Sequence, residues 1–297
     1  MAEIASIAGA PFLAAPELSA LAGALCRDGD RVRLVGGAVR NHLMGRPVAD
    51  LDLATEATPE VVSARARAAG FTVHPTGVEH GTVTVVVVGH AFEVTTLRAD
   101  LSTDGRRARV AFTRDWRCDA ERRDFTMNAI YADPDGTLFD PVGGVADALA
   151  RRVRFIGEAD ARIAEDYLRI LRFFRFHATI GEGPLDPVGL AASIRGRDGL
   201  ARLSRERIGQ EMRKLLLGAR AAETLAAMQA AGLVDRVLAG IGRPAVLARF
   251  AAAFAEDAAL TPATALAAFA GFSEVDGPRL AERLRLSRAE GVTVAAL

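Results

Sequence analysis

Short apolar runs of strand length alternate with segments of helical spacing over the first half of the chain. The strand-length runs are Val32–Val35, Asp50–Leu53, Thr72–His74, Thr82–Val88 and Phe92–Thr96. Helical spacing is found at Leu18–Arg27, Ala38–Met44 and Pro59–Ala69. Because side chains repeat every two residues on a strand face and every three or four on a helix face, this alternation predicts a small α/β domain.

The second half of the chain has a different pattern. From about residue 145 onward it is rich in Ala, Leu and Arg at helical spacing, and Gly181–Pro187 separates one predicted helix from the next. Within the first half, Ala99–Arg117 is charged and lacks apolar periodicity, which predicts a mobile loop. We therefore predict an α+β protein with a small mixed sheet over residues 1–148, followed by all-helical regions over residues 149–220 and 221–297.

Composition narrows the class of protein only in part. Half of the 297 residues are hydrophobic, which is enough to build the cores of two or three domains. The formal net charge is zero, so total charge does not indicate a nucleic-acid binder. Arginines do cluster, yet Lys214 is the only lysine among 37 basic residues, a bias that is typical of GC-rich coding and requires no binding role.

Cysteine and hydropathy patterns indicate a compartment. Cys26 and Cys118 are far apart in sequence and form no disulfide framework, so we expect a reducing cytoplasm. We see no signal peptide and no apolar run of membrane-spanning length, and the five histidines lack zinc-ligand spacing. We therefore expect a cytoplasmic protein that does not associate with a membrane and has no stable protein partner.

A motif near the start of the chain brings two carboxylates together. The run from Leu34 to Arg40 has the pattern of a strand, a Gly–Gly turn and a helix start, and Asp50-Leu51-Asp52 follows ten residues later. Residues two apart on a strand point to the same side, so we expect both aspartates on one face. Adjacent carboxylates resist joint ionisation unless a cation lies between them, and Mg²⁺ is held by such carboxylates together with substrate phosphates.

The same motif offers a phosphate site. Gly36 and Gly37 let a phosphate approach the backbone closely, and the helix start behind them presents free N–H groups. Arg40 on the first helical turn offers a bidentate phosphate contact. Together with the carboxylates, these residues predict a nucleoside-triphosphate site for metal-assisted nucleotidyl transfer.

The order of these residues resembles the first motif of the class II CCA-adding tRNA nucleotidyltransferases and bacterial poly(A) polymerases, which belong to the polymerase-beta-like nucleotidyltransferases. The resemblance extends from about residue 30 to residue 235. It implies a polymerase-beta-like nucleotidyltransferase head, followed by an all-helical neck and body. Asn41 departs from the family, which often has Asp after this arginine, and we transfer no role to it.

Two further segments of the first domain match the family. The run Arg122-Arg123-Asp124, continued by Phe-Thr-Met-Asn-Ala, resembles its RRDFTxNA motif. Alone, such a run is more often a salt-bridged helix start. The resemblance implies that the arginines bind the nucleotide and that Asp124 contacts the ribose 2′-OH. Glu93 lies in a segment that resembles the EVTTxR strand, where it either braces the strand, which we favour, or adds a third carboxylate to the metal.

The helical half carries a possible template for the incoming base. Glu165-Asp166-Tyr167-Leu168-Arg169 resembles the family's EDxxR motif, in which Asp and Arg bind the base edge and select CTP or ATP. Spacing alone places Asp166 and Arg169 on one helix face, where an exposed ion pair is the simpler interpretation. The resemblance implies that Glu165, Asp166 and Arg169 form the template.

The segments that follow the template are also similar to the family. Arg172 and Arg175 lie in an LRxxRF-like run and are further candidates for nucleotide binding. Residues 204–214 resemble the last family motif, ERxxxExxK, which we interpret as structural support for the template helix, with Ser204 as its N-cap.

The resemblance implies addition of CCA to the tRNA 3′ end from CTP and ATP, with release of pyrophosphate and two Mg²⁺ ions held by Asp50 and Asp52. The alternatives are a bacterial poly(A) polymerase, a partial CC- or A-adding enzyme, and a catalytically inactive RNA-binding protein on the same fold. Residues 73–92 contain no Lys or Arg, which disfavours poly(A) polymerase. Four arginines keep the loop before the RRD motif basic and favour full CCA addition: Arg106, Arg107, Arg109 and Arg114. We expect the tRNA-binding tail to be short or truncated.

Overall fold

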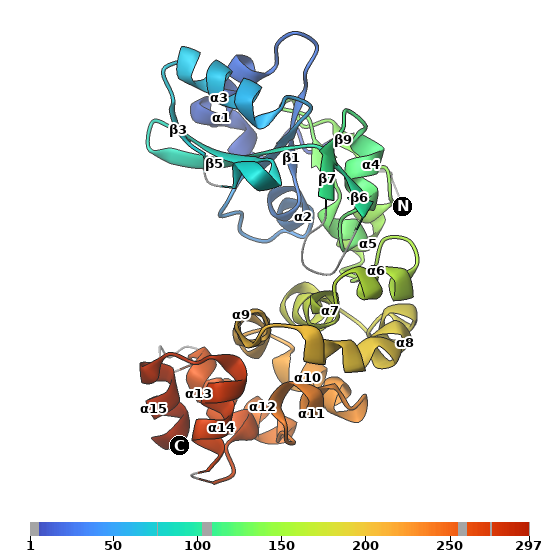
Figure 1. The fold of residues 1–297 in the computed structure, drawn as a ribbon, viewed down its shortest axis with the longest axis vertical. Helices are drawn as coiled ribbons and strands as arrows, with labels where there is room; N and C mark the ends of the chain where they lie inside the picture. The colour runs from blue at the N-terminus through green and yellow to red at the C-terminus, as the bar shows by residue number, and fades with distance from the viewer. Residues whose placement is uncertain (1–5, 76, 103–108, 255–259, 274, 297) are drawn as a thin grey trace. The chain divides into compact units, whose positions relative to one another are not determined.

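The computed structural model describes residues 6–75, 77–102, 109–254, 260–273 and 275–296. Its contacts divide the chain into two compact units (Figure 1). The sheet unit comprises residues 1–150 and 154–157, and the helical unit comprises residues 151–153 and 158–297. The α+β fold predicted from the sequence is confirmed, whereas the domain limits at residues 148 and 220 stay predictions.

Among the described residues, seven strands form a mixed sheet in the order β3-β4-β5-β2-β1-β8-β9. Its strands are β1 (Val32–Val35), β2 (Asp52–Thr55), β3 (Thr72–His74), β4 (Thr82–Val87), β5 (His90–Thr96), β8 (Tyr131–Ala132) and β9 (Leu138–Phe139). The β2–β5 pair is parallel and the other neighbours are antiparallel. The interior strand β1 is buried along its whole length, so the Gly–Gly turn that follows it is anchored by the core.

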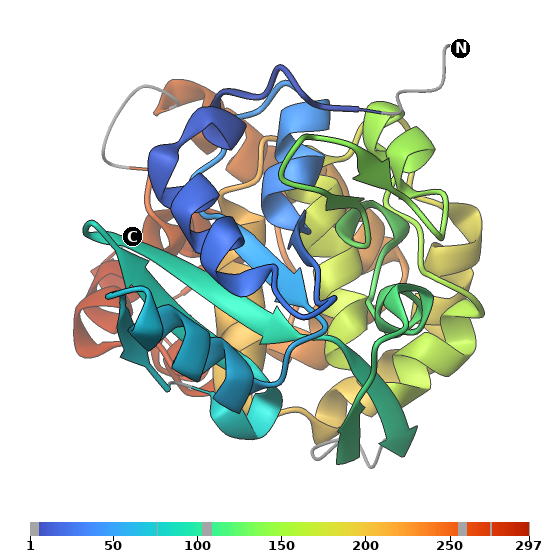
Figure 2. The ribbon, with the colours of Figure 1, turned by 90° about the horizontal axis from the view of Figure 1, so that it is seen from above.

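Helices cover both faces of this sheet (Figures 1 and 2). Helices α1 (Pro16–Leu25) and α3 (Pro59–Ala68) pack together on one face, and α2 (Gly37–Leu43) and α5 (Gly144–Leu149) pack together on the other. Near β1 and β8, an apolar cluster that includes Val35, Trp116 and Tyr131 forms part of the core. This cluster fixes the elements that carry the candidate site.

The start of β2 differs from the prediction. The strand begins at Asp52, because pairing with both β1 and β5 covers only Asp52 and the residues after it. Asp50 is exposed and precedes the first pair, whereas Leu53 is buried between the neighbouring strands. The predicted strand start at Asp50 is therefore two residues early, and only Asp52 belongs to β2.

The predicted mobile loop over Ala99–Arg117 is wrong for the residues that the structure describes. They form an antiparallel pair, β6 (Arg98–Ser102) and β7 (Arg109–Phe112), followed by α4 (Trp116–Glu121). Residues 103–108 lie outside the described residues. A two-stranded ribbon is held by backbone hydrogen bonds and needs no apolar alternation. The charged sequence therefore carried no pattern from which the ribbon could be predicted. Asp115 caps α4 by accepting hydrogen bonds from the backbone of Arg117 and Cys118.

The helical unit contains no β-strand in its described parts. Its helices are α6 (Ala159–Glu165), α7 (Leu168–Ile180), α8 (Pro187–Gly196), α9 (Arg205–Leu216), α10 (Ala221–Ala230), α11 (Leu233–Leu238), α12 (Pro244–Ala253), α13 (Pro262–Ala270), α14 (Asp276–Leu284) and α15 (Arg288–Ala296). The predicted break at Gly181–Pro187 is confirmed, since α7 ends at Ile180 and α8 begins at Pro187. Helix α7 buries Phe173 and Phe174 and packs against α9. In the described residues, none of the helices has both the length and the apolar surface that a membrane crossing requires.

Candidate active site

The carboxylates gather where β2 begins. Asp52 is the first residue of β2 and lies opposite Glu93 in the parallel register with β5. Burial raises the pKa of Asp52, the charges of Glu93 and Asp50 raise it further, and Arg123 opposes them. In the part of the chain that the structure describes, no salt bridge pairs any of these three carboxylates. The structure therefore brings Asp50 and Asp52 into one electrostatic site, although only Asp52 belongs to the strand.

This site fits a divalent cation that the substrate helps to bind. A half-buried carboxylate beside like charges favours a bound cation, because the cation removes the repulsion. No group of three or more His, Cys, Asp or Glu side chains among the described residues is arranged to hold a metal ion by itself. Mg²⁺ is often held by one or two carboxylates plus substrate phosphates, so the incomplete ligand set suits it. Glu93 is exposed, and both of its possible roles stay predictions.

The Gly–Gly turn lies against the RRD segment. Gly36 has φ +71° and ψ −117°, a conformation that side-chain-bearing residues rarely adopt, and it leads directly into α2. A Cβ atom on Gly36 would lie 3.7 Å from the carbonyl oxygen of Asn128 and 3.9 Å from Nη1 of Arg123. A side chain here would both strain the turn and fill the space between the backbone and the arginine.

Two asparagine side chains orient Arg40 of α2. Its Nη1 donates to Oδ1 of Asn128 at 2.5 Å, and its Nε and Nη2 donate to Oδ1 of Asn41 at 3.1 and 2.8 Å. Asn128 in turn donates to Oδ1 of Asp124 at 3.0 Å, which also accepts from the backbone N–H of Phe125. Sequence reasoning gave Asn41 no role and did not single out Asn128. Both hold Arg40, and their side-chain partners could not be identified from spacing.

A buried aspartate connects the two arginines of the RRD segment. Asp119 of α4 is 1% exposed and accepts from Arg122 at 2.7 Å and from Arg123 at 3.0 Å. The hydroxyl of Tyr131 donates to the same carboxylate at 2.7 Å. Burial alone favours the neutral carboxyl, but the two guanidinium groups hold the pKa of Asp119 at about 2. Sequence reasoning missed this residue, although its spacing of three and four residues from the arginines is that of helical ion pairs.

The template residues of the helical unit are not on one helix face. Asp166 follows the last residue of α6 in an extended conformation, φ −153° and ψ 106°, so the predicted single helix is wrong. Its side chain accepts from the backbone N–H of Leu168, the first residue of α7, at 3.1 Å. Arg207 of α9 donates to its other oxygen at 2.6 Å. Arg169 contacts Glu165 and donates to the carbonyl oxygen of residue 162 at 2.8 Å.

The next arginines join α7 to α9. Arg175 donates to Glu211 at 2.5 Å, and Arg172 lies 3.9 Å from the same carboxylate. Glu211 itself is buried, with 6% of its surface exposed. The structure thus uses both arginines in helix packing, and their role in nucleotide binding stays a prediction. Arg207 and Glu211 both come from the ERxxxExxK-like segment, so the structural contact predicted between this segment and the EDxxR-like region is present.

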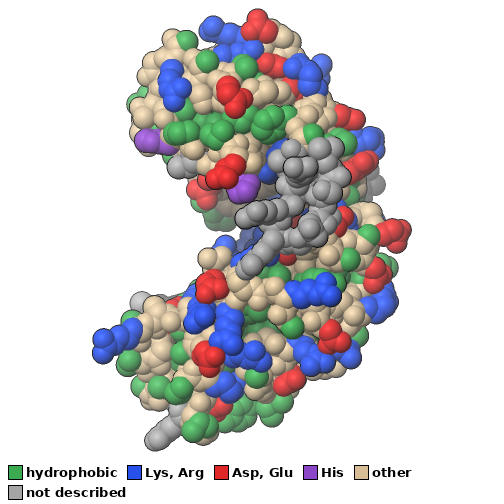
Figure 3. All heavy atoms as spheres, in the orientation of Figure 1, with side chains coloured by type: hydrophobic (Ala, Val, Ile, Leu, Met, Phe, Trp, Pro, Cys, Tyr) green, Lys and Arg blue, Asp and Glu red, His purple; other side chains and the backbone are tan. Residues whose placement is uncertain are grey.

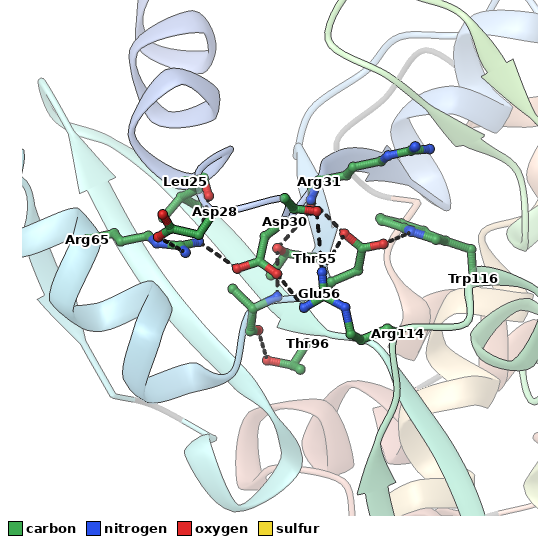
Figure 4. A network of polar contacts seen from close by, with 12 residues as sticks. Leu25, Asp28, Asp30, Arg31, Thr55, Glu56, Arg65, Thr96, Arg114 and Trp116 are labelled. Atoms are coloured by element: carbon green, nitrogen blue, oxygen red, sulfur yellow. Dashed lines mark hydrogen bonds and ion pairs between the residues drawn. The ribbon is translucent and has the colours of Figure 1, made fainter.

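The four arginines that made the predicted loop basic are not equivalent in the structure. Arg106 and Arg107 lie outside the described residues, and Arg109 begins β7. Arg114 donates to Asp30 at 2.6 Å (Figure 4). Arg114 therefore ties the end of the hairpin to Asp30, while its side chain stays 63% exposed.

Family models match both units. The model of the Poly A polymerase head domain matches residues 32–154. The model described as the probable RNA and SrmB-binding site of polymerase A matches residues 186–242.

Curated relatives are similar over most of this chain. The mitochondrial CCA tRNA nucleotidyltransferase 1 of Homo sapiens is 45% identical over 204 residues, which cover 68% of this chain and 47% of that protein. The CCA-adding enzyme of Geobacillus thermodenitrificans is 42% identical over 236 residues, which cover 77% of this chain and 56% of that protein. The chain therefore spans about half the length of the curated relatives that it matches.

Solved structures share the fold. The crystal structure of the Bacillus stearothermophilus CCA-adding enzyme in complex with CTP has a TM-score of 0.72 and 36% identity, and the match covers 95% of this chain and 65% of that chain. A tRNA nucleotidyltransferase complexed with a primer tRNA and an incoming ATP analog has a TM-score of 0.74 at 24% identity, with 92% of this chain and 82% of that chain covered. The second likeness concerns the fold alone.

Proposed function

The chain belongs to the family of CCA-adding enzymes and poly(A) polymerases that share the Poly A polymerase head domain, and from that premise we propose that it adds CCA to the 3′ end of tRNA from CTP and ATP. One observation carries the catalytic part of this proposal. The carboxylate cluster around Asp52 lies within the electrostatic reach of Arg123, and Arg123 in turn lies against the Gly36 turn. An anionic metal site and a cationic phosphate site are therefore adjacent, as nucleotidyl transfer requires.

The family uses divalent metal ions, and we propose that Asp50 and Asp52 hold two Mg²⁺ ions. When bound, such ions would lower the pKa of the ribose hydroxyl and would neutralise negative charge on the pyrophosphate that leaves. The residues of the chain position the nucleotide. Gly36 and Gly37 admit the triphosphate to the backbone, and Arg40 joins them as a further donor.

The RRD segment contacts the nucleotide in this proposal. Arg122 and Arg123 bind triphosphate oxygens through their guanidinium groups. Asp124 accepts a hydrogen bond from the ribose 2′-OH, which distinguishes a ribonucleotide from a deoxyribonucleotide. The buried position of Asp124 strengthens this selection, because a substrate without the hydroxyl leaves the carboxylate with one partner fewer.

In the helical unit, Asp166 and Arg169 form the base template, with Glu165 supporting Arg169. A carboxylate accepts from the exocyclic amine of cytosine or adenine, and a guanidinium donates to ring acceptors. Uracil lacks the amine, so it would leave Asp166 without that donor. Arg207 and Glu165 already hold the two template side chains, which limits the reorganisation that base binding requires.

The tRNA partner is supported by charge distribution. Figure 3 shows Lys and Arg side chains gathered on one face of the helical unit, although the whole chain has no net charge. The RNA-binding family model lies in the same unit, at residues 186–242. Phosphate contacts by arginine supply most of the sequence-independent affinity for RNA. The cytoplasm remains the proposed compartment, and both cysteines are free thiols.

The test is incorporation of each labelled nucleotide, singly and in pairs, into tRNAs that end before CCA, after C and after CC. Ordered addition of C, C and A that then stops supports the proposal. Long A-tails would identify a poly(A) polymerase, and addition limited to CC or to the last A would identify a partial-adding enzyme. Equilibrium binding of CTP with Mg²⁺ is measured in parallel, because this chain spans about half of its relatives and tRNA binding could fail independently.

A further inference from the structure

Asp119 is a carboxylate with an unusually full set of donors. Its two oxygens accept hydrogen bonds from Arg122, Arg123 and Tyr131, and Oδ1 also accepts from the backbone N–H of Arg98 at 3.2 Å. It is 1% exposed, so none of these bonds competes with bulk water. A buried carboxylate that accepts several charge-assisted hydrogen bonds has a well-defined orientation.

The two oxygens of Asp119 separate the two arginines. Oδ1 accepts from Arg122 at 2.9 Å through Nε and at 2.7 Å through Nη2. Oδ2 accepts from Arg123 at 3.3 Å through Nε and at 3.0 Å through Nη2. Each guanidinium therefore approaches through its Nε–Nη2 edge, and the carboxylate holds the two cations on different sides.

Tyr131 completes the support of Arg123. Its hydroxyl donates to Oδ2 of Asp119 at 2.7 Å and accepts from Nε of Arg123 at 3.1 Å. The ring is fully buried in the apolar cluster near β1, and the centre of the Arg123 guanidinium lies 5.3 Å from its centroid. Because packing fixes the ring, the hydroxyl is fixed as well.

This arrangement directs one corner of Arg123 to the Gly–Gly turn. The Nε–Nη2 edge is bound by Asp119 and Tyr131, and Nη1 is the atom that lies 3.9 Å from the position of a Cβ on Gly36. The charges of the group also matter. Two guanidinium groups and one carboxylate leave a net positive charge, which suits a polyanion such as a triphosphate.

We propose that Asp119, assisted by Tyr131, is a positioning residue that holds Arg122 and Arg123 in the geometry that binds the nucleotide triphosphate. This inference rests on the proposed function, because it takes the triphosphate as the ligand of the two arginines. Asp119 does not touch the nucleotide and acts through the guanidinium groups. Nothing in its charge would attract a phosphate, so any effect on nucleotide affinity must pass through its partners.

Two variants and one control test this role by equilibrium binding of CTP in the presence of Mg²⁺. Asp119→Asn keeps the size of the side chain but removes the charge, and we expect about tenfold weaker CTP binding from loss of preorganisation. Tyr131→Phe keeps the ring and removes only the hydroxyl, and we expect roughly threefold weaker binding. Asp30→Asn is the matched control, because Asp30 also accepts hydrogen bonds from two arginines, Arg65 and Arg114. Neither of these arginines lies within 4 Å of a Cβ on Gly36.

A structural role alone would lower thermal stability in all three variants and leave CTP affinity unchanged in each. The proposed role predicts weaker CTP binding in Asp119→Asn and Tyr131→Phe but not in Asp30→Asn, and a rise in the KM for CTP that exceeds any fall in kcat. In an Arg123→Ala background, Asp119→Asn should weaken CTP binding by less than it does in the unaltered protein. The reason is that Arg123, one of the two arginines through which Asp119 acts on CTP, is then absent.

Full additivity of the two substitutions would overturn the proposal. If Asp119→Asn does not fold, unchanged CTP affinity in Tyr131→Phe would overturn the proposal by itself. Failure of the proposed function is recognised separately. If the unaltered protein binds neither CTP nor ATP with Mg²⁺, the triphosphate site itself is wrong. If it binds them and the Asp119 and Tyr131 variants bind them equally well, only the positioning role is wrong.

Discussion

The two ends of β2 use the same residue types in opposite ways. At its start, Asp52 lies beside Asp50 and Glu93, and burial and these like charges raise its pKa. At its other end, Asp30 and Glu56 lie among arginines and N–H donors (Figure 4). Burial opposes ionisation of Asp30, but hydrogen bonds from its arginines lower its pKa overall. One end therefore favours a bound cation, and the other is already neutralised by the protein.

The neutralised end joins elements that are distant in sequence. Asp30 accepts from Arg65 of α3 at 2.8 Å and from Arg114 at 2.6 Å. Glu56 accepts from the indole N–H of Trp116 at 2.8 Å and from the backbone N–H of Arg31 at 2.7 Å. The comparison teaches that carboxylate clusters indicate a binding site only where the protein leaves the charges without partners.

The largest expected effect comes from Asp52→Asn. This change removes a proposed metal ligand, so nucleotide incorporation should fall by roughly a thousandfold. The same change removes like-charge repulsion, so thermal stability at neutral pH should stay the same or rise. Incorporation of labelled CTP and a melting curve measure the two effects. A large loss of stability would contradict the view that this end of β2 is not built for stability.

Gly36→Ala should damage binding and folding together. The positive φ of Gly36 disfavours any other residue by on the order of 1–3 kcal/mol, and the added Cβ would lie beside the Asn128 carbonyl oxygen and Nη1 of Arg123. Gly29 is the matched control at the neutralised end, because its φ is +81° but an added Cβ would meet no atom within 4 Å. Gly29→Ala should lower the melting temperature without changing CTP affinity, and equal effects of both variants on CTP would count against the Gly36 site.

Asp30→Asn should lower the free energy of unfolding by on the order of 1 kcal/mol, because two guanidinium groups lose their charged partner. We expect no change in CTP binding. Chemical denaturation and a CTP titration on the same sample measure both quantities. Weaker CTP binding at unchanged stability would show that the two ends of β2 are not functionally separate.

The smallest expected effect is the pH dependence of stability. The folded-state pKa of Asp30 is lowered, so its contribution is present above the ordinary Asp pKa and is lost as pH falls through the folded value. The folded-state pKa of Asp52 is raised, so its contribution is present below the ordinary Asp pKa and is lost as pH rises through the folded value. Denaturation from pH 3 to pH 7 should give opposite changes of slope in Asp30→Asn and Asp52→Asn, and slopes of the same sign would contradict this assignment.

The sequence predicted the regular elements best where apolar periodicity is strong. The residues of β1 were predicted correctly because this strand is buried along its whole length, and the α7–α8 break was predicted correctly because Gly and Pro interrupt the pattern. The β6–β7 ribbon was missed because its pairing depends on backbone hydrogen bonds. Asp166 was misplaced because a spacing of three residues does not reveal that the chain leaves the helical conformation between α6 and α7.

The candidate site was predictable as residue types and motifs but not as contacts. Asp52 and Arg123 were identified, and their electrostatic coupling became visible only in the structure. Asp119, Asn41 and Asn128 were missed as ligands of the arginines, because their roles depend on how α4, α2 and the RRD segment pack together.

The shared carboxylate of Asp119 also constrains how this protein could change by successive single substitutions. Loss of Arg122 or Arg123 alone leaves Asp119 with one guanidinium partner, so either arginine can be substituted without leaving the carboxylate unpaired. Loss of Asp119 alone leaves two like charges side by side near a buried tyrosine. In a lineage, we therefore expect the aspartate to be the last of the three to disappear, and we expect libraries that randomise this segment to recover it most often.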